Sequence, residues 1–159
     1  MPRWRPVRRA AALLAFTLLL VVVAAAASVE DWSRDLRASE AATARAHPDE
    51  RLRPIDEVEL DPRTLSLRIE ELVAQRLGWR HVSTELGPSS ATVRFEARSR
   101  LFFTDDIEVR LAPSPSGVGL TIEAESRSRV AVGDLGANPR NLRALLEVVR
   151  TGLIADGGL

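Results

Sequence analysis

Arginines and carboxylates gather where three alternating segments and a helix are expected to begin or end. Together with Asn138, the residues are Arg98, Arg100, Asp105, Asp106, Arg127, Arg129, Asp134, Arg140 and Arg143. A guanidinium group binds a carboxylate or a phosphate through two parallel hydrogen bonds, and a helix N-terminus adds a favourable dipole. The pattern therefore predicts a binding site for a carboxylate, a phosphate or a lipid head group.

The same residues also have a structural interpretation. Asp105, Asp106 and Asp134 would neutralise the arginines and fasten the sheet to the last helix. The sequence leaves both interpretations open, because the meeting of the strand ends depends on a register that it does not specify.

Catalytic and metal-binding patterns are missing from the sequence. Asp105 and Asp106 are neighbours in an expected strand, so they point to opposite faces and do not form an acid–base pair. The two histidines, His47 and His81, are not spaced as metal ligands, and the chain has no cysteine. No nucleophile elbow, phosphate-binding glycine loop or His-Glu-x-x-His motif occurs. We therefore expect no catalytic residue, no metal and no cofactor.

The elements that would position the candidate site follow from apolar spacing. Asp61 as N-cap and Pro62 at the first helical position predict a helix that Gly78 ends. Residues 79–86 predict a first strand, and three alternating strands follow. Their apolar faces hold Val93, Phe95 and Ala97; Ile107, Val109 and Leu111; and Val118, Leu120, Ile122 and Ala124. Asn138 as N-cap before Pro139 predicts a last helix.

This order of helix, four strands and helix predicts an α+β fold. Hairpin-length connections favour an antiparallel sheet of about four strands with both helices packed on one face. The fold would also include an N-terminal transmembrane or signal helix. The other face of the sheet would carry a mixed lattice of arginine and glutamate side chains, stabilised by cross-strand pairs.

The N-terminal third of the chain divides in two. Residues 10–29 contain no charge, follow four arginines and are flanked by Trp4 and Trp32, which predicts a membrane anchor with a cytoplasmic N-terminus. A cleavable signal peptide is the alternative, since alanines precede Ser28. We divide the chain into an anchor or signal segment over 1–29, a partly ordered tether over 30–61, and an α+β domain over 62–155.

The charge balance excludes one class of partner. Four of the 22 basic residues precede the apolar segment, so 18 basic residues face 22 acidic ones in the rest of the chain. Nucleic-acid binding needs a concentrated basic surface that releases phosphate counterions. We therefore expect no nucleic-acid partner.

Three motifs in serial order give the chain a family resemblance. They are residues 95–110 (FEARSRLFFTDDIEVR), residues 125–130 (ESRSRV) and residues 134–138 (DLGAN) followed by Arg140 and Arg143. With Leu52-Arg53-Pro54 and Leu77-Gly78-Trp79 included, residues from about 50 to 150 resemble the bacterial and plastid domain-of-unknown-function family 1499. Many relatives carry a cysteine-containing segment upstream, which this chain lacks. The resemblance implies a fold and a surface location rather than a chemistry.

The sequence thus predicts an uncharacterised envelope protein. We expect a non-catalytic domain that binds a protein partner or an anionic ligand through its arginine-bearing sheet end, anchored in the cell membrane by a single N-terminal span. The domain would lie outside the cytoplasm, or the protein would be secreted after signal cleavage. The alternatives are an enzyme that uses Asp105 or Asp134 with the neighbouring arginines, and a purely structural envelope component.

Overall fold

Alternating apolar and polar residues build the middle of an antiparallel sheet. The computed structural model describes residues 13–20, 22–23, 39–98, 103–129 and 136–157. Its three central strands are β4 (Ala91–Arg98), β5 (Thr104–Pro113) and β6 (Leu120–Ser128), paired without register shifts. Every second side chain of β4, such as Val93 and Phe95, is buried. One face of these strands is therefore the floor of the core.

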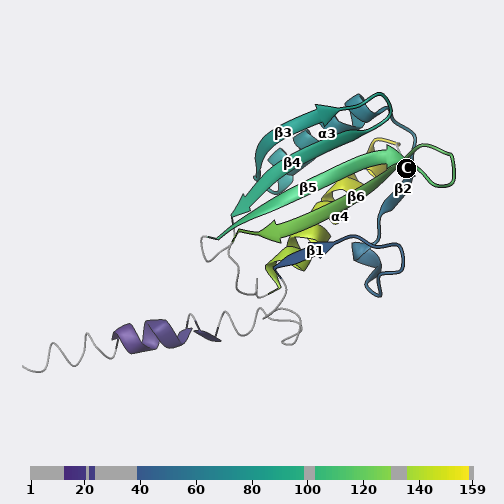
Figure 1. The fold of residues 1–159 in the computed structure, drawn as a ribbon. Coiled ribbons are helices and arrows are strands. Elements are labelled where there is room, and N and C mark those ends of the chain that lie inside the picture. The colour runs from purple at the N-terminus through teal and green to yellow at the C-terminus, as the bar shows by residue number, and fades with distance from the viewer. Residues whose placement is uncertain (1–12, 21, 24–38, 99–102, 130–135, 158–159) are drawn as a thin grey trace, which may run out of the picture.

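The described residues form a sheet of six strands, in the order β1-β6-β5-β4-β3, and β2 also pairs with β6. Strand β3 (Arg80–Leu86) forms one edge. The opposite edge of β6 is covered by two short strands, β1 (Glu40–Ala42) against residues 125–127 and β2 (Ile55–Val58) against residues 120–122. Figure 1 shows these short strands following one another along β6.

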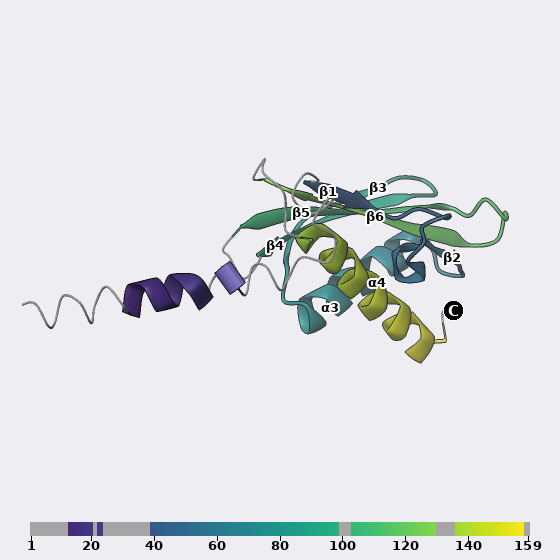
Figure 2. The ribbon, with the colours of Figure 1, turned by 90° about the horizontal axis from the view of Figure 1, so that it is seen from below.

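Two helices cover the apolar face of the sheet (Figure 2). Asp61 caps α3 (Pro62–Arg76) by accepting hydrogen bonds from the backbone N–H groups of Arg63 and Thr64, both at 3.0 Å. Helix α4 (Ala137–Ala155) packs beside α3, and the short 3-10 helix η1 (Glu50–Leu52) packs against α4. The two long helices come close at Gly152, where an added Cβ would lie 2.5 Å from Leu72 Cδ1.

The predicted architecture, about four strands with two helices and an N-terminal transmembrane or signal helix, is wrong. The sheet gains β1 and β2 from the stretch that we interpreted as a tether, and η1 adds a short third helix to the domain. Both strands are too short to reveal a period of two. In β2 the pattern is also broken, because Glu57 has a φ of 61° and the buried residues Ile55 and Val58 are three positions apart.

Among the residues that the structure describes, no helix combines the length and the apolar character needed to cross a membrane.

Candidate functional site

Most of the predicted ligand-binding residues lie at one end of the sheet, which we call the arginine end. It contains Arg98, Asp105, Asp106, Arg127 and Arg129. The register places Arg98 opposite Thr104 at the turn between β4 and β5, and Asp106 opposite Arg127 on β6. The start of β1 and the start of α4 also lie here. Arg100 and Asp134, two further predicted site residues, are outside the described residues.

Asp105 is a buried carboxylate beneath the first turns of α4. Its side chain is only 1% exposed and accepts hydrogen bonds from Ser128 Oγ at 2.5 Å and from Asn141 Nδ2 at 2.9 Å. Both donors are neutral. A buried carboxylate held by neutral donors is unusual, because burial penalises an unpaired charge. The bond to Asn141 connects β5 to α4, whereas no arginine of the described residues forms an ion pair with Asp105.

Asn138 does not have its predicted role as a helix N-cap. The N-cap is Gly136, with a φ of 75°, and Asn138 lies inside the first turn, fully buried. Its amide accepts from Ser126 Oγ at 2.6 Å and donates to the backbone oxygen of Ser39 at 2.8 Å. The Asn138 side chain points to the sheet because the buried Ser126 hydroxyl and the Ser39 carbonyl need hydrogen-bond partners there.

Arg127 and Arg129 lie on the outer face of the sheet and are bound by carboxylates. Arg129 forms a two-bond contact with Asp106, at 2.6 and 2.9 Å, and a further bond of 2.5 Å to Glu96. These bonds, first to Asp106 and then to Glu96, raise the pKa of Arg129. Arg127 pairs with Glu40 at 3.0 Å and with Glu125 at 3.1 Å. Their charges are therefore already balanced within the domain.

The outer-face pairs continue across the whole sheet. They join Arg80 to Glu96, Arg94 to Glu85 and Glu108, and Arg110 to Glu108 and Glu125. This arrangement is the mixed-charge lattice that the alternating sequence predicts, and each exposed pair contributes little by itself. Asp105 and Asp106 lie on opposite faces, as strand alternation predicts, so they do not act as a pair.

The helix arginines face other partners. Arg143 Nε donates to Asp49 Oδ2 at 2.8 Å, and this contact links α4 to the start of η1. Hydrogen bonds from Arg51 and from Arg143 hold the pKa of Asp49 below its ordinary value of 3.8. Arg140 is half-buried in the first turn of α4. Since Arg143 is bound in the helix layer and Arg127 and Arg129 lie across the sheet from it, these three do not line one pocket.

A polar group that the sequence analysis missed lies between α3 and β3. Thr84 donates its hydroxyl proton to Glu70, and Thr84 Oγ1 lies 2.9 Å from His81 Nε2. Because the single hydroxyl proton goes to Glu70, His81 donates to Thr84 instead of accepting from it. His81 also packs edge-on against Phe95, with ring centroids 5.9 Å apart. The imidazole therefore does not activate the hydroxyl as a catalytic triad would.

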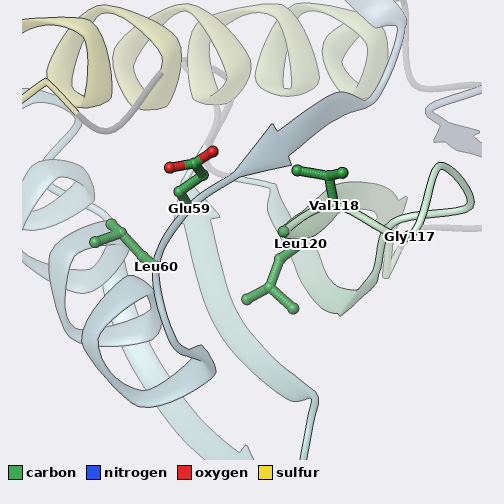
Figure 3. Close-up of a pocket in the computed structure, with 6 residues that line it drawn as sticks. Glu59, Leu60, Gly117, Val118 and Leu120 are labelled. Carbon is green, nitrogen blue, oxygen red and sulfur yellow. The ribbon is translucent and has the colours of Figure 1, made fainter.

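The opposite end of the sheet has an open hollow of about 490 Å³ (Figure 3). Glu59 and Leu60, which follow β2, lie on one side, and residues 117–120 of the β5–β6 hairpin lie on the other. Gly119 is required at this contact, since an added Cβ would lie 2.6 Å from the Val58 oxygen and its φ is 64°. Among the described residues, Glu59 is the one ionisable side chain that lines the hollow.

The described part of the chain has no group of three His, Asp or Glu side chains placed to hold a metal ion.

The sequence analysis missed the partners that bind the predicted site residues. These partners are Asn141, Ser126, Glu40 and Asp49. Only the register and the helix packing reveal them, because each is distant in sequence from the group that it binds.

The comparisons with known proteins agree with the motif resemblance. A family model described as a protein of unknown function (DUF1499) matches residues 28–149. No curated protein and no solved structure is significantly similar to the chain. The match includes β1 to β6 and most of α4, so the chain belongs to the DUF1499 family of proteins of unknown function.

Proposed function

We propose that this chain is a non-catalytic domain, held at a membrane or exported across it by its apolar N-terminal segment, that binds an extended segment of a protein partner along strand β3. The observation that carries the proposal is that β3 is the one long edge strand without a second partner among the described strands. The outer face of the sheet is covered by ion pairs, the inner face by α3 and α4, and the edge of β6 by β1 and β2.

Strand β3 has the properties of a strand-addition site. It has seven residues and pairs only with β4 among the described strands, so alternate backbone N–H and C=O groups point outward. An added strand binds such groups through main-chain hydrogen bonds, and its alternate side chains provide specificity. Val82 and Leu86 are 47% and 51% exposed along this edge.

Helix α3 provides a wall for the side chains of the partner. The bond from Thr84 to Glu70 fixes α3 beside β3. Leu67 lies one helical turn before Glu70, on the side of β3 that ends at Leu86, and is 57% exposed. An extended segment with apolar residues at alternate positions would bury Leu67 and Leu86 together.

A bulge defines where the partner would pair. The register of β3 with β4 shifts between His81 and Ser83, so Val82 is an extra residue. Bulges interrupt regular pairing. The regular ladder from Ser83 to Leu86 is therefore the part of β3 that we assign to the partner.

The contacts of the carboxylates support a binding domain over the alternative enzyme. Asp105 is buried and bound by Ser128 and Asn141, so it is not presented to a substrate, and the neighbouring Asp106 is bound to Arg129. Asp134, the other carboxylate of that alternative, lies outside the described residues.

Photo-crosslinking in the membranes of the source organism tests the proposal. A photoreactive residue in place of Val82 should give a discrete heavier adduct, and Leu86→Lys in the same chain should abolish it. Val118 is a matched control, because it is 50% exposed and lies at the hairpin away from β3. Equal adducts from positions 82 and 118, or no adduct at position 82, would overturn the assignment to β3.

A separate measurement tests on which side of the membrane the domain lies. The chain has no cysteine, so a Val118→Cys variant carries a single thiol. Labelling of intact cells by a membrane-impermeant maleimide should modify it fully if the domain lies outside the cytoplasm. Labelling only after lysis would contradict export of the domain. It would not affect the assignment of the partner site to β3, which the crosslinking tests.

A further inference from the structure

The chain enters the folded domain at the arginine end. The backbone oxygen of Ser39 accepts from the N–H of Ser128 at 2.8 Å and from Asn138 Nδ2 at 2.8 Å. Glu40, the next residue, pairs with Arg127 at 3.0 Å. Ser39 is thus fixed to both β6 and α4. The N-terminal segment is therefore joined to the folded domain at this point.

The segment between the uncharged run and Ser39 is short. Nine residues separate Ser39 from Val29, the last residue of the uncharged run. The ten steps from Val29 to Ser39 span at most about 36 Å when fully extended. Strand β5 has ten residues and is about 34 Å long. If residues 10–29 attach the chain to a membrane, the arginine end is the part of the domain held closest to it, and the hairpin at residues 117–119 lies at the far end (Figures 1 and 2).

The arginine end carries two exposed side chains that suit a lipid surface, beside the ion pairs of Arg127 and Arg129. Phe103, directly before β5, is 45% exposed, and Arg98 is exposed with no ion-pair partner among the described residues. Aromatic rings and arginines are favoured at the membrane interface, where a guanidinium group binds lipid phosphate. At the far end, exposed Val118 shares its hollow with the carboxylate of Glu59, which an anionic lipid surface would repel.

We infer that the arginine end rests on the lipid surface, with Phe103 at the level of the head groups and Arg98 bound to lipid phosphate. This inference depends on the membrane attachment in the proposed function and adds an orientation to it. The orientation leaves β3 accessible from the side, because β3 runs along the sheet instead of closing its arginine end.

Single-cysteine labelling of the full chain tests the orientation. Phe103→Cys and Val118→Cys variants would be reconstituted in phosphatidylcholine–phosphatidylglycerol vesicles and labelled with an environment-sensitive fluorophore. Lipids with a nitroxide on the head group should quench the label at position 103 at least threefold more than the label at position 118. Circular dichroism melts of both variants establish that each is folded.

A charge reversal tests the contact itself. Arg98→Glu should lower the quenching at position 103, whereas Arg63→Glu, an exposed arginine in the first turn of α3 at the far end, should leave it unchanged. Equal quenching at positions 103 and 118 in vesicle-bound protein overturns the orientation alone. A chain that fails to float with the vesicles overturns the membrane attachment and the orientation together, so the two failures are distinguishable.

Discussion

Replacing Gly152 by alanine tests the close approach of α3 and α4. Gly152 is buried, and a Cβ at this position would lie 2.5 and 2.6 Å from the two Leu72 methyl carbons and 3.1 Å from Leu72 Cγ. Carbon atoms pack at about 3.5–4.0 Å. Because Leu72 is itself 1% exposed, its side chain has no solvent to move into. The added methyl group must therefore displace Leu72 or separate the helices.

Two opposing effects determine the size of the change. Alanine in a helix interior is more favourable than glycine by about 0.5–1 kcal/mol. Overpacking a core by a methyl group costs about 1–3 kcal/mol. Since the overlap involves three atoms of one buried side chain, we expect overpacking to prevail. Gly152→Ala should lower the free energy of unfolding by about 1–2 kcal/mol, which lowers Tm by roughly 4–10 °C for a domain of this size.

Urea denaturation of the full chain measures this change, with Thr151→Ala as the control. Thr151 is exposed on the same turn of α4, and its hydroxyl makes one exposed hydrogen bond, to the Glu147 backbone oxygen at 2.6 Å. Its replacement adds no core contact, and the gain in helix propensity should leave stability close to that of the parent. Leu72→Ala alone should cost about 2–5 kcal/mol. In the Leu72→Ala/Gly152→Ala double variant the new methyl group fills part of the vacated space, so the loss should be smaller than the sum of the single losses by about 1 kcal/mol or more. A higher Tm for Gly152→Ala, or strict additivity in the double variant, would refute the steric argument.

Two further substitutions test the contacts that hold the N-terminal strands. The pKa of Asp49 is lowered by hydrogen bonds from Arg51 and Arg143, so its contribution to stability is complete above about pH 4 and is lost as the pH falls through the lowered folded value. Asp49→Asn should therefore lower Tm at pH 7 and make Tm fall less steeply below pH 4 than in the parent; parallel Tm–pH curves would contradict this sign. Asn138→Ala leaves the Ser39 oxygen and the Ser126 hydroxyl without their amide partner, and it should cost about 1–3 kcal/mol. Hydrogen exchange should then accelerate at residues 40–42 more than at residues 107–111, and uniform acceleration would show that β1 is not held locally.

The sequence predicts elements well where its periodicity is long. Strands β4 and β5 have eight and ten residues, enough for alternation to identify both the strand and its buried face. Strands β1 and β2 have three and four residues, and a left-handed residue interrupts the second. The expected position of Val118 is also wrong. It lies 50% exposed in the hairpin, since the Ser114 N–H donates to the Gly119 oxygen and β6 begins only at Leu120.

The pairings of the candidate site residues were not predictable from the sequence. The alternation of side chains along a strand is enough to place Asp105 and Asp106 on opposite faces of the sheet. The partners of Arg129 depend on the register of three strands, and Glu96 is 33 residues away in sequence. Asn138 followed by Pro139 has the composition of a helix start. The N-cap is Gly136 instead. The side-chain amide of Asn138 binds the Ser126 hydroxyl and the Ser39 oxygen, so it does not cap the helix.

The unequal edges of the sheet limit the stoichiometry of any assembly that the domain forms by strand addition. On the β6 side, β1 and β2 divide the edge into two short pieces, and Glu57 interrupts the second with its left-handed backbone. Short, irregular edges do not template further strands. In the described part of the sheet, β3 is then the one open edge, so after it pairs with a partner strand no second long edge remains there for another. If the domain binds a partner strand as proposed, assembly would terminate at a single pairing, and one-to-one complexes would form at high local concentration without polymerising into fibres.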